Sequence, residues 1–297
     1  MLSRAFAASL LLASLPGSVA AQGSLTDTYR ETADRILEAT MADTVGFEKL
    51  TYLTTSIGHR LSGSTSLERA IEWAYEQMRE EKLDNVRKLP VQVPHWVRGR
   101  ESARVLSPVE KEIAILGLGG SIATPGGPLT ASVVAVRSFE ELAALGRDVV
   151  LGRIVLYAVP WMGYGETVRY RASGASRAAD LGAVAALVRS ATGRSLYTPH
   201  TGALRYDEGS ASIPAASVTV EDAEWMARLI AAGQEVKVEL SMEARMLPDA
   251  QSFNVVAEIQ GREKPDEVVV MGAISIRGTW ARERMTTARP ASPRGRP

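Results

Sequence analysis

Residues 252–272, SFNVVAEIQGREKPDEVVVMG, decide the fold that the sequence predicts. They hold two runs rich in β-branched side chains, residues 253–259 and 267–271, separated by a charged turn that contains a glycine and a proline. This is the pattern of two strands at the heart of a larger sheet. The following residues, 273–297, hold six arginines, one glutamate and no lysine, without apolar periodicity. The predicted sheet is therefore begun but not continued in the chain as written.

The length and composition are those of an ordinary globular protein. With 297 residues, of which 45% are hydrophobic, the chain is long enough for about two domains with a sizeable core. Lys and Arg together number 34, as do Asp and Glu, so the charge balance does not indicate a nucleic-acid-binding protein. The chain has no cysteine, which excludes disulfides, a thiolate nucleophile and a zinc site built from cysteine.

Residues 1–21 have the pattern of a secretory signal peptide. Arg4 precedes an apolar run at residues 5–15, Pro16 and Gly17 break that run, and small residues lead to a cleavage site after Ala21. A membrane anchor is the alternative, but eleven apolar residues fall short of the roughly 20 that span a bilayer. The sequence therefore predicts an exported protein, secreted or periplasmic, without a membrane span.

Three amphipathic helices are predicted after the signal peptide. Apolar residues recur at three- and four-residue steps in residues 25–41, 47–57 and 65–78. Thr65 and Glu68 have the spacing of a capping box at the start of the third helix. A turn-rich segment, GHRLSGS, precedes this helix, and a half-buried strand follows it, with Pro90 arguing for an edge position.

Strands and short helices alternate in the middle of the chain. A strand at residues 102–106 and an apolar segment at 113–118 lead into glycines and prolines at 117–128, which we interpret as a domain boundary. The chain returns at Ser252 to the predicted sheet. The residues between form an inserted α/β domain of about 120 residues, with predicted strands at 133–136, 154–159, 183–188, 213–218 and 236–242 and helices at 139–145, 172–181 and 220–232.

The histidines do not have the spacing of metal ligands. His59, His95 and His200 stand alone in the sequence, and none belongs to an HExxH motif or a similar pair. A zinc site built from these three residues is therefore not predicted. His59 is expected to orient its loop instead.

Other candidate residues have ordinary structural explanations. Ser121 follows two glycines but lacks the strand–turn–helix frame of a serine nucleophile. Glu80 with Glu81, and Asp207 with Glu208, resemble acid/base pairs, but adjacent residues point apart, so solvated faces are expected. No residue of the chain is assigned as catalytic, cofactor-binding or metal-binding.

Aromatic residues near two glycines leave two interpretations open. Trp161, Tyr164 and Tyr170 lie around Gly163 and Gly165. They either line a binding surface of the inserted domain or cover its core. The sequence does not decide between these alternatives.

The arrangement of these segments resembles the exported zinc exopeptidases of the carboxypeptidase Q (plasma glutamate carboxypeptidase) type, which carry a protease-associated domain. The resemblance covers residues 25–272. Its marks are the GHRLSGS turn before a long helix, the strand pair at 86–97 and 102–106, the IPAASV segment at 213–218, and above all SFNVVAEIQG at 252–261 followed by EVVVMG at 267–272.

The resemblance implies an α/β fold in which N-terminal helices and the first strands of a zinc-exopeptidase sheet are interrupted by an inserted protease-associated α/β domain. The implied organisation is a signal peptide at 1–21, the first part of the peptidase domain at 22–118, the protease-associated domain at 119–248, incomplete peptidase strands at 249–272 and an aberrant tail at 273–297. The family is implied to hydrolyse short peptides with two zinc ions, through a metal-bound water and a glutamate that shuttles the proton.

The sequence departs from the family after Gly272. In the family, the last strand continues into a His-x-Asp-Ser-Trp-Asp segment and later a His-Asp-Asp-Gly segment, which hold the metals. Here Ala273, Ile274, Ser275 and the residues after them supply no such ligand. The resemblance therefore predicts that this chain binds no catalytic zinc and is inactive as written.

A shifted reading frame accounts for the departure. When the last base of each codon is read with the first two of the next, residues 273–289 can encode HLDSWDVGEGAHDDGA. Trp280 and Met285 each have a single codon, so each fixes the first base of the shifted codon that starts with its last base. In both cases the residue that the shifted codon encodes still matches the family-like sequence. We therefore hypothesise a frameshift near Gly272, either in the gene or in its sequencing.

A non-catalytic protein is the alternative function. In this interpretation the protein is an exported module whose inserted domain binds peptides or other proteins. Zinc content distinguishes the alternatives. For the family-like enzyme the expected partners are short peptides and possible second copies in a homodimer, with neither nucleic acid nor a membrane span.

Overall fold

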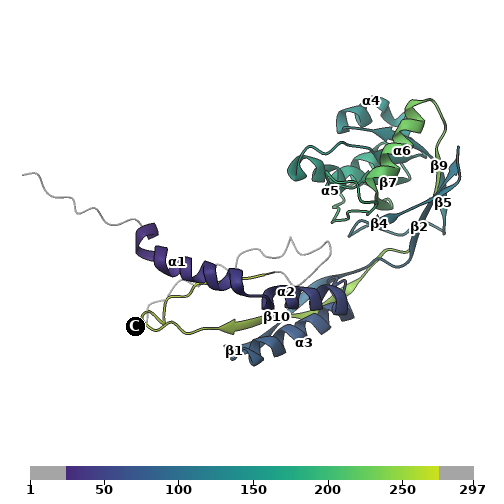
Figure 1. The fold of residues 1–297 in the computed structure, drawn as a ribbon. Helices are drawn as coiled ribbons and strands as arrows, with labels where there is room; N and C mark the ends of the chain where they lie inside the picture. The colour runs from purple at the N-terminus through teal and green to yellow at the C-terminus, as the bar shows by residue number, and fades with distance from the viewer. Residues whose placement is uncertain (1–24, 274–297) are drawn as a thin grey trace, which may run out of the picture. The chain divides into compact units, whose positions relative to one another are not determined.

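The computed structural model describes residues 25–273 (Figure 1). The predicted signal peptide at residues 1–21 lies outside the described residues, as does the predicted aberrant tail from residue 274 onward. The described chain divides into two units, one ending at Tyr52 and the other beginning at Leu53. Within residues 25–273, every helix is too short or too polar to cross a membrane.

The first unit consists of two helices, α1 (Leu25–Ala42) and α2 (Val45–Tyr52). The helix predicted at residues 25–41 is therefore confirmed. Between the helices, the backbone N–H of Gly46 donates to Asp43 Oδ2 at 3.3 Å. Neither helix has a buried residue, so the apolar stripe of α1, including Ile36 and Leu37, is exposed.

The helix predicted at residues 47–57 changes type in the middle. Helix α2 ends at Tyr52, and a π-helical turn, η1 (Leu53–Ile57), begins the second unit. Gly58 N donates to the carbonyl of Leu53 at 3.0 Å, which is the five-residue spacing of a π-turn. Ile57 is buried and anchors this turn.

The glycine-rich turn at residues 58–64 is organised by a buried arginine. Gly58 and Gly63 have φ values of +79° and +75°, in the left-handed region that favours glycine. Arg60 is 6% exposed, and its Nη1 donates to the carbonyls of Leu53 and Gly58, both at 2.6 Å. His59, which we expected to orient this loop, is exposed, so the neighbouring Arg60 performs that task.

Helix α3 (Thr65–Glu80) follows the turn and confirms the third predicted helix. Its N-cap is Ser64, whose Oγ accepts a hydrogen bond from the backbone N–H of Leu67 at 3.2 Å. The capping box predicted from Thr65 to Glu68 is therefore wrong by one residue. Thr65 already has a place inside the helix, whereas Ser64 has the extended backbone that an N-cap needs.

A long antiparallel ribbon joins distant parts of the chain. Strand β1 (Asp84–Val97) pairs with β10 (Arg245–Glu258), with Val91 opposite Ser252. The strand predicted at residues 253–259 is thus largely confirmed, as the end of a longer one. Helix α3 packs on this ribbon, where Ser252 Oγ donates to Glu68 Oε1 at 2.8 Å.

The second strand of the opening stretch is not formed, and this prediction is wrong. Residues 267–271 have no regular structure, and Val268, Val269, Val270 and Met271 are 80–90% exposed. The sheet of β10 contains only β1 in the described part of the chain. A β-branched run without a neighbouring strand has no partner for its backbone groups, and so the residues stay irregular.

Within the second unit, a mixed eight-stranded sheet forms the centre of the region that we call the α/β domain (residues 101–242). Its order is β3-β2-β9-β5-β6-β7-β8-β4, with β5 to β8 parallel and the outer pairs antiparallel. The strands are β2 (Glu101–Ser107), β3 (Lys111–Ile113), β4 (Ile115–Gly117), β5 (Leu129–Val136), β6 (Ile154–Tyr157), β7 (Ala185–Arg189), β8 (Ala215–Val218) and β9 (Lys237–Met242).

All five strands predicted for the inserted domain are present, and so are its helices, α4 (Phe139–Val150), α5 (Tyr164–Asp180) and α6 (Val220–Ala231). The sheet also takes in β2, β3 and β4, which precede the predicted domain start at residue 119. The strands predicted at 86–97 and 102–106 therefore belong to different sheets. The glycines and prolines at 117–128 lie inside the domain, between β4 and β5.

The parallel strands are buried on both faces. Helices α4 and α5 cover one face of the sheet and α6 covers the other (Figure 1). In β6, Val155 and Tyr157 face the first layer while Ile154 and Leu156 face the second, and all four are 0% exposed. Since side chains alternate between faces, burial of both faces requires a continuous apolar run, which is what the sequence shows.

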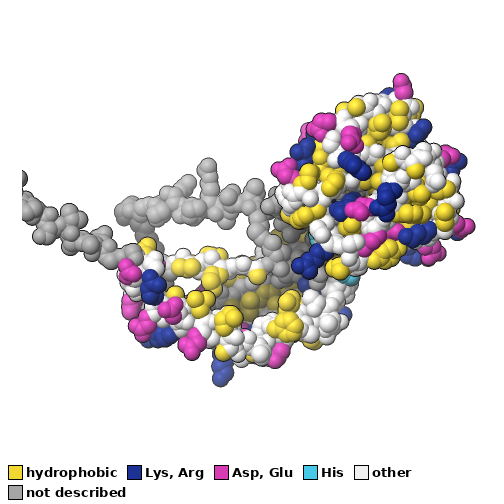
Figure 2. Space-filling view, turned by 45° about the horizontal axis from the view of Figure 1, so that its top comes forward, with side chains coloured by type: hydrophobic (Ala, Val, Ile, Leu, Met, Phe, Trp, Pro, Cys, Tyr) yellow, Lys and Arg dark blue, Asp and Glu magenta, His cyan; other side chains and the backbone are white. Residues whose placement is uncertain are grey.

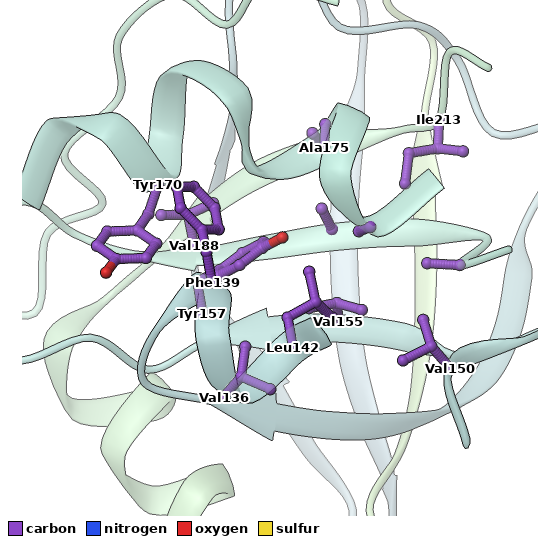
Figure 3. Close-up of a cluster of buried hydrophobic side chains, with 14 of the residues drawn as sticks. Val136, Phe139, Leu142, Val150, Val155, Tyr157, Tyr170, Ala175, Val188 and Ile213 are labelled. Atoms are coloured by element: carbon purple, nitrogen blue, oxygen red, sulfur yellow. The ribbon is translucent and has the colours of Figure 1, made fainter. Parts of the chain in front are cut away.

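An aromatic cluster fills the first layer (Figure 3). The ring of Phe139 lies 4.5 Å from that of Tyr170 and 5.8 Å from that of Tyr157, centroid to centroid. Tyr157 donates its hydroxyl to the carbonyl of Gly174 at 2.7 Å, and its ring leaves no space for a Cβ at that glycine. Burial raises the pKa of Tyr157, so it stays a neutral donor.

Two short connections link the ribbon to the α/β domain. One runs from β1 to β2 through Gly99, whose φ of +69° and close approach to Glu243 exclude a side chain. The other runs from β9 to β10 through Glu243, which accepts two hydrogen bonds from the Arg100 guanidinium at 2.9 and 3.1 Å. Beside them, the buried Trp96 donates from Nε1 to the carbonyl of Ser121 at 2.8 Å.

We expect Trp96→Phe to lower the free energy of unfolding by about 1–3 kcal/mol, because the buried carbonyl of Ser121 loses its donor. Trp161→Phe is the matched control: Trp161 is 40% exposed, so a change within about 0.5 kcal/mol is expected. Urea unfolding followed by circular dichroism measures both. Equal losses in the two variants would contradict this account of the junction.

Candidate functional site

The loops that follow β6 and β7 form the candidate site, which we call the loop cluster (residues 158–164 and 190–204). They leave the carboxyl ends of neighbouring parallel strands. Ligands of open α/β sheets bind most often at this edge, because the loops there are free to vary while the strands hold them in place. Their position at this edge of the sheet makes these loops the candidate binding site.

Buried serines anchor the long loop after β7. Ser190 Oγ donates to the carbonyl of Val218 at 2.7 Å and accepts from the backbone N–H of His200 at 2.8 Å. Ser217 Oγ donates to the carbonyl of His200 at 3.1 Å. Both serines are at most 1% exposed. The loop is therefore fastened to the strand ends through the backbone of His200, while the imidazole of that residue is left available.

The start of helix α6 holds the same loop from another direction. Glu221 Oε1 accepts from Ser195 Oγ at 2.7 Å and from the backbone N–H of Tyr197 at 2.9 Å. The hydrogen bond from Ser195 is the main cause that lowers the pKa of Glu221, so this carboxylate is ionised at neutral pH.

A buried carboxylate adds a charge pair beside these contacts. Asp222 is 0% exposed and accepts a hydrogen bond from Lys111 Nζ at 2.5 Å. This hydrogen bond raises the pKa of Lys111. The ammonium group also lies over the rings of Trp225 and Tyr197, with 4.9 and 5.7 Å to the ring centroids. Lys111 is thereby committed to structure rather than to proton transfer.

Arg171 ties the two loops of the cluster together. Its Nη1 donates to the carbonyl of Thr201 at 3.0 Å, and its Nη2 donates to the hydroxyl of Tyr164 at 2.8 Å. The side chain is 6% exposed, and Gly202 lies so close that a Cβ there would meet Cζ at 2.1 Å. We call the contacts of Arg171 with Thr201 and Tyr164 the Arg171 clamp. It requires a glycine at position 202, and no sequence motif indicates that requirement.

The anchored loops present an apolar rim. The exposed fractions are 40% for Trp161, 54% for Met162, 53% for Tyr164, 70% for Leu196 and 47% for Tyr197. Figure 2 shows apolar side chains interspersed with acidic and basic ones over the face of the α/β domain that it presents. Rigid aromatic side chains on fixed loops are suited to contact with a peptide or another protein.

The core interpretation of the aromatic residues is confirmed for Tyr170 alone, and the binding surface stays a prediction for the exposed Trp161 and Tyr164. Tyr170 is 4% exposed and belongs to the core beside Phe139. Trp161 and Tyr164 are on the rim of the loop cluster. The difference follows from their places in the fold, since Tyr170 lies on the face of α5 that packs on the sheet, Tyr164 begins that helix and Trp161 lies in the loop before it.

The three histidines lie in separate environments. His59 is exposed in the turn before α3, and the ring of His95 packs on Gly63, where a Cβ would meet it at 2.7 Å. His200 is in the loop cluster, and its pKa is lowered, first by burial and then by the Arg171 charge. Among residues 25–273, no cluster of three or more His, Asp or Glu could hold a metal ion.

The remaining candidates have structural roles or are solvated. Ser121 is 1% exposed, and its Oγ accepts from the backbone N–H of Ala215 at 2.8 Å, so it fastens the loop after β4 to strand β8. Glu80, Glu81, Asp207 and Glu208 are all exposed, as predicted.

The loop cluster can bind, but its contacts do not assemble a hydrolytic site. The hydroxyls of Ser190 and Ser217 are engaged with carbonyls. Glu221 Oε1 and Asp222 Oδ1 are engaged with donors, whereas the buried Oε2 of Glu221 and Oδ2 of Asp222 have no hydrogen-bond partner in the described part of the chain. Among residues 25–273, no three His, Asp or Glu side chains come together as a metal site would need. The described residues therefore do not fit a two-zinc centre, and no hydrolytic step is assigned to them.

Comparison with known proteins places this fold among the peptidases. The structure superposes on the crystal structure of a peptidase M28 precursor from Shewanella amazonensis with a TM-score of 0.80 and 32% identity, covering 85% of this chain and 58% of that chain. A zinc aminopeptidase from Bacillus subtilis, at a TM-score of 0.50 and 20% identity over 74% of this chain and 48% of that one, shares the fold alone. No protein-family profile matches the chain.

The relatives found by sequence indicate a narrower class of peptidase than the solved structures do. Carboxypeptidase Q from Xenopus laevis is 45% identical over 82% of this chain and 52% of the relative, and that from Bos taurus is 46% identical over the same shares. The Homo sapiens protein is 46% identical over 76% of this chain and 48% of the relative. The chain is therefore a relative of the zinc exopeptidases of the carboxypeptidase Q type, and it spans about half the length of those it matches.

We expect Gly202→Ala to destabilise the α/β domain by about 1–3 kcal/mol, because the new Cβ would overlap the Arg171 guanidinium and force it from its carbonyl. Gly165→Ala is the control. A Cβ there meets nothing within 4 Å, and alanine favours the helix, so no loss is expected. Thermal unfolding measures both. An unchanged midpoint for Gly202→Ala would show that the clamp is not needed.

Proposed function

We propose that this chain is encoded by a gene for an exported zinc exopeptidase that hydrolyses short peptides, and that the chain as written binds no catalytic zinc and is inactive. The observation that carries the proposal is that a shifted reading frame at residues 273–289 can encode two metal-ligand segments of the family in the right order. The two His and four Asp residues of the shifted frame each depend on the codon of a different residue. These residues are Ile274, Ile276, Thr279, Met285, Thr286 and Thr287.

Homology supports the peptidase part of the proposal. Curated relatives from several vertebrates are carboxypeptidase Q and are 43–46% identical. Residues 25–273 contain no group of three or more His, Asp or Glu that could hold a metal ion. The signal-peptide pattern at residues 1–21 supports export to the periplasm or the cell exterior.

The structure at residues 267–271 agrees with an interruption at Gly272. In the family this run is the strand that leads into the first metal ligand. Here the same residues are exposed and irregular. A reading frame that continued into family sequence would supply the neighbouring strands that the run needs for pairing.

A second candidate function is a non-catalytic, peptide- or protein-binding module. The observation that favours it is the rim of the loop cluster, where Trp161, Met162 and Tyr164 are held by buried anchors and remain 40–54% exposed. The α/β domain overlaps the residues 119–248 for which the resemblance predicts a protease-associated domain. In this candidate the α/β domain binds and the ribbon serves as a scaffold.

The decisive experiment compares two forms of the gene. One encodes the chain as written, and the other carries one base inserted at the Gly272 codon and is read to its next stop. We expect the restored form to hold about two zinc ions per chain and to cleave dipeptides, as two-metal peptidases do. We expect neither property in the chain as written. Elemental analysis and a dipeptidase assay measure both.

Two controls separate the alternatives. A restored gene with alanine codons in place of the two shifted-frame histidine codons should lose zinc and activity together. Resequencing the gene distinguishes a natural frameshift from a sequencing error. Two zinc ions and dipeptidase activity in the chain as written would refute the proposal, and a restored form without zinc would favour the binding module.

A further inference from the structure

The eight-stranded sheet has a seam where its two ends meet. Its edge strands, β3 and β4, are separated in the chain by Ala114 alone, and β4 lies beside β2. Strand β4 pairs with β8, and β2 pairs with β3 and β9, but among the described strands no backbone ladder joins β2 to β4. The backbone groups of β4 that face this seam therefore need side chains as partners.

Arg98 and Glu101 supply those partners at Gly117, the last residue of β4. The backbone N–H of Gly117 donates to both carboxylate oxygens of Glu101, at 2.9 and 3.0 Å. Arg98 Nη2 donates to the carbonyl of the same glycine at 3.3 Å. A Cβ at position 117 would meet Glu101 Oε2 at 2.5 Å, so this close contact requires a glycine. We call these contacts the Gly117 latch.

The carboxylate of Glu101 has few partners for a buried charge. Its side chain is 11% exposed, and its two oxygens share one N–H donor, although an ionised carboxylate has about four acceptor sites. The cation beside it is not hydrogen-bonded to it, because Arg98 Nε lies 3.7 Å from Oε1 and has no hydrogen-bond partner among the described residues. A neutral carboxyl group fits such a place at a lower desolvation cost than a charged one.

The surroundings of the latch contain little else that titrates. Among the described residues, Arg98 is the charged group that acts on Glu101. Strand β9 contributes the apolar Met242 beside Gly117, and the loop after β7 contributes the hydroxyl of Thr201. Burial raises the pKa of Glu101, against the opposite effects of the Gly117 N–H and of Arg98. The contacts and the pKa thus both favour the neutral form.

We propose that Glu101 is a proton-operated latch, whose neutral form keeps the seam between β2 and β4 closed and whose ionised form lets it open more readily. The ionised carboxylate gains hydration when the seam opens, whereas the neutral group gains much less. The folded state therefore binds this proton more tightly than the unfolded chain does. The resulting stability is present in acid and is lost as the pH rises from the ordinary pKa of a glutamate through the raised one.

The latch is connected to the loop cluster. The carbonyl of Gly117 also accepts from Thr201 Oγ1 at 2.9 Å, and the carbonyl of Thr201 accepts from Arg171 in the Arg171 clamp. Opening of the seam therefore removes one attachment of the loop after β7, and acid tightens that attachment. This regulation goes beyond the proposed function and is independent of it, because none of its contacts involves zinc or catalysis.

The first test compares the full chain with its Glu101→Gln variant, because glutamine has the shape of a neutral glutamate and does not titrate. Thermal unfolding is followed from about pH 8 to about pH 5, above the ordinary pKa of a glutamate. We expect the midpoint of the parent to rise relative to that of the variant as the pH falls. Equal pH dependence in the two proteins would overturn the proposal.

Glu243→Gln is the matched control on the neighbouring connection. Hydrogen bonds from Arg100 lower the pKa of Glu243, so its contribution to stability is present above the ordinary glutamate pKa and is lost only in stronger acid. The midpoint of the parent relative to Glu243→Gln should therefore stay level over the same pH range. A rise equal to that seen with Glu101→Gln would show that the effect is not specific to the latch and would overturn the proposal.

Two measurements on the parent alone decide the matter even if Glu101→Gln does not fold. Carbon-13 NMR of the Glu101 carboxyl group should give a titration midpoint above that of an ordinary glutamate. Amide exchange at Gly117 and Thr201, corrected for the intrinsic effect of pH, should be slower near pH 5 than near pH 8. An ordinary or lowered midpoint would overturn the proposal, and so would exchange that does not slow in acid.

Discussion

Backbone pairing is the constraint on which the rest of this structure depends. Strand β6 and residues 267–271 are both short runs of large apolar and β-branched residues, but their outcomes are opposite. The first is fully buried between β5 and β7, and the second is irregular and up to 90% exposed. A strand persists where neighbours satisfy its N–H and C=O groups and both its faces are covered. Composition alone does not provide either condition.

Much of the α/β domain could be predicted from the sequence for the same reason. Each parallel strand is buried on both faces, so it appears as a continuous apolar run, and the helices between them have a clear apolar stripe. The ribbon was harder to predict, because β1 and β10 are paired across about half the chain and only one end of β10 carries a strong apolar pattern. Strands β2 to β4, which precede the predicted domain start at residue 119, join the eight-stranded sheet, and this was not expected because they are short and their glycine-rich exit resembles a linker.

The loop cluster shows a different limit of sequence analysis. Its shape depends on buried polar contacts of Ser190, Arg171 and Glu221, and none of these residues has a recognisable motif around it. Each is understood only when the distant carbonyl or N–H that it binds is known. The exposed Trp161 and the buried Tyr170 looked equivalent in the sequence, but Trp161 lies in the loop before α5 and Tyr170 lies inside that helix. The departure from the family after Gly272, by contrast, was visible in the sequence, because the family's ligand segments have a fixed spacing that residues 273–289 do not contain.

A well-paired α/β domain attached to a two-stranded ribbon, with residues 267–271 left without a neighbouring strand in the described part of the chain, is the central claim of this account. Hydrogen–deuterium exchange of the full chain, followed by mass spectrometry, tests it most directly, because amide protection reports backbone pairing residue by residue. The account predicts the slowest exchange in β5 to β8 and unprotected exchange at residues 260–272. Protection of residues 267–271 comparable to that of β6 would contradict it.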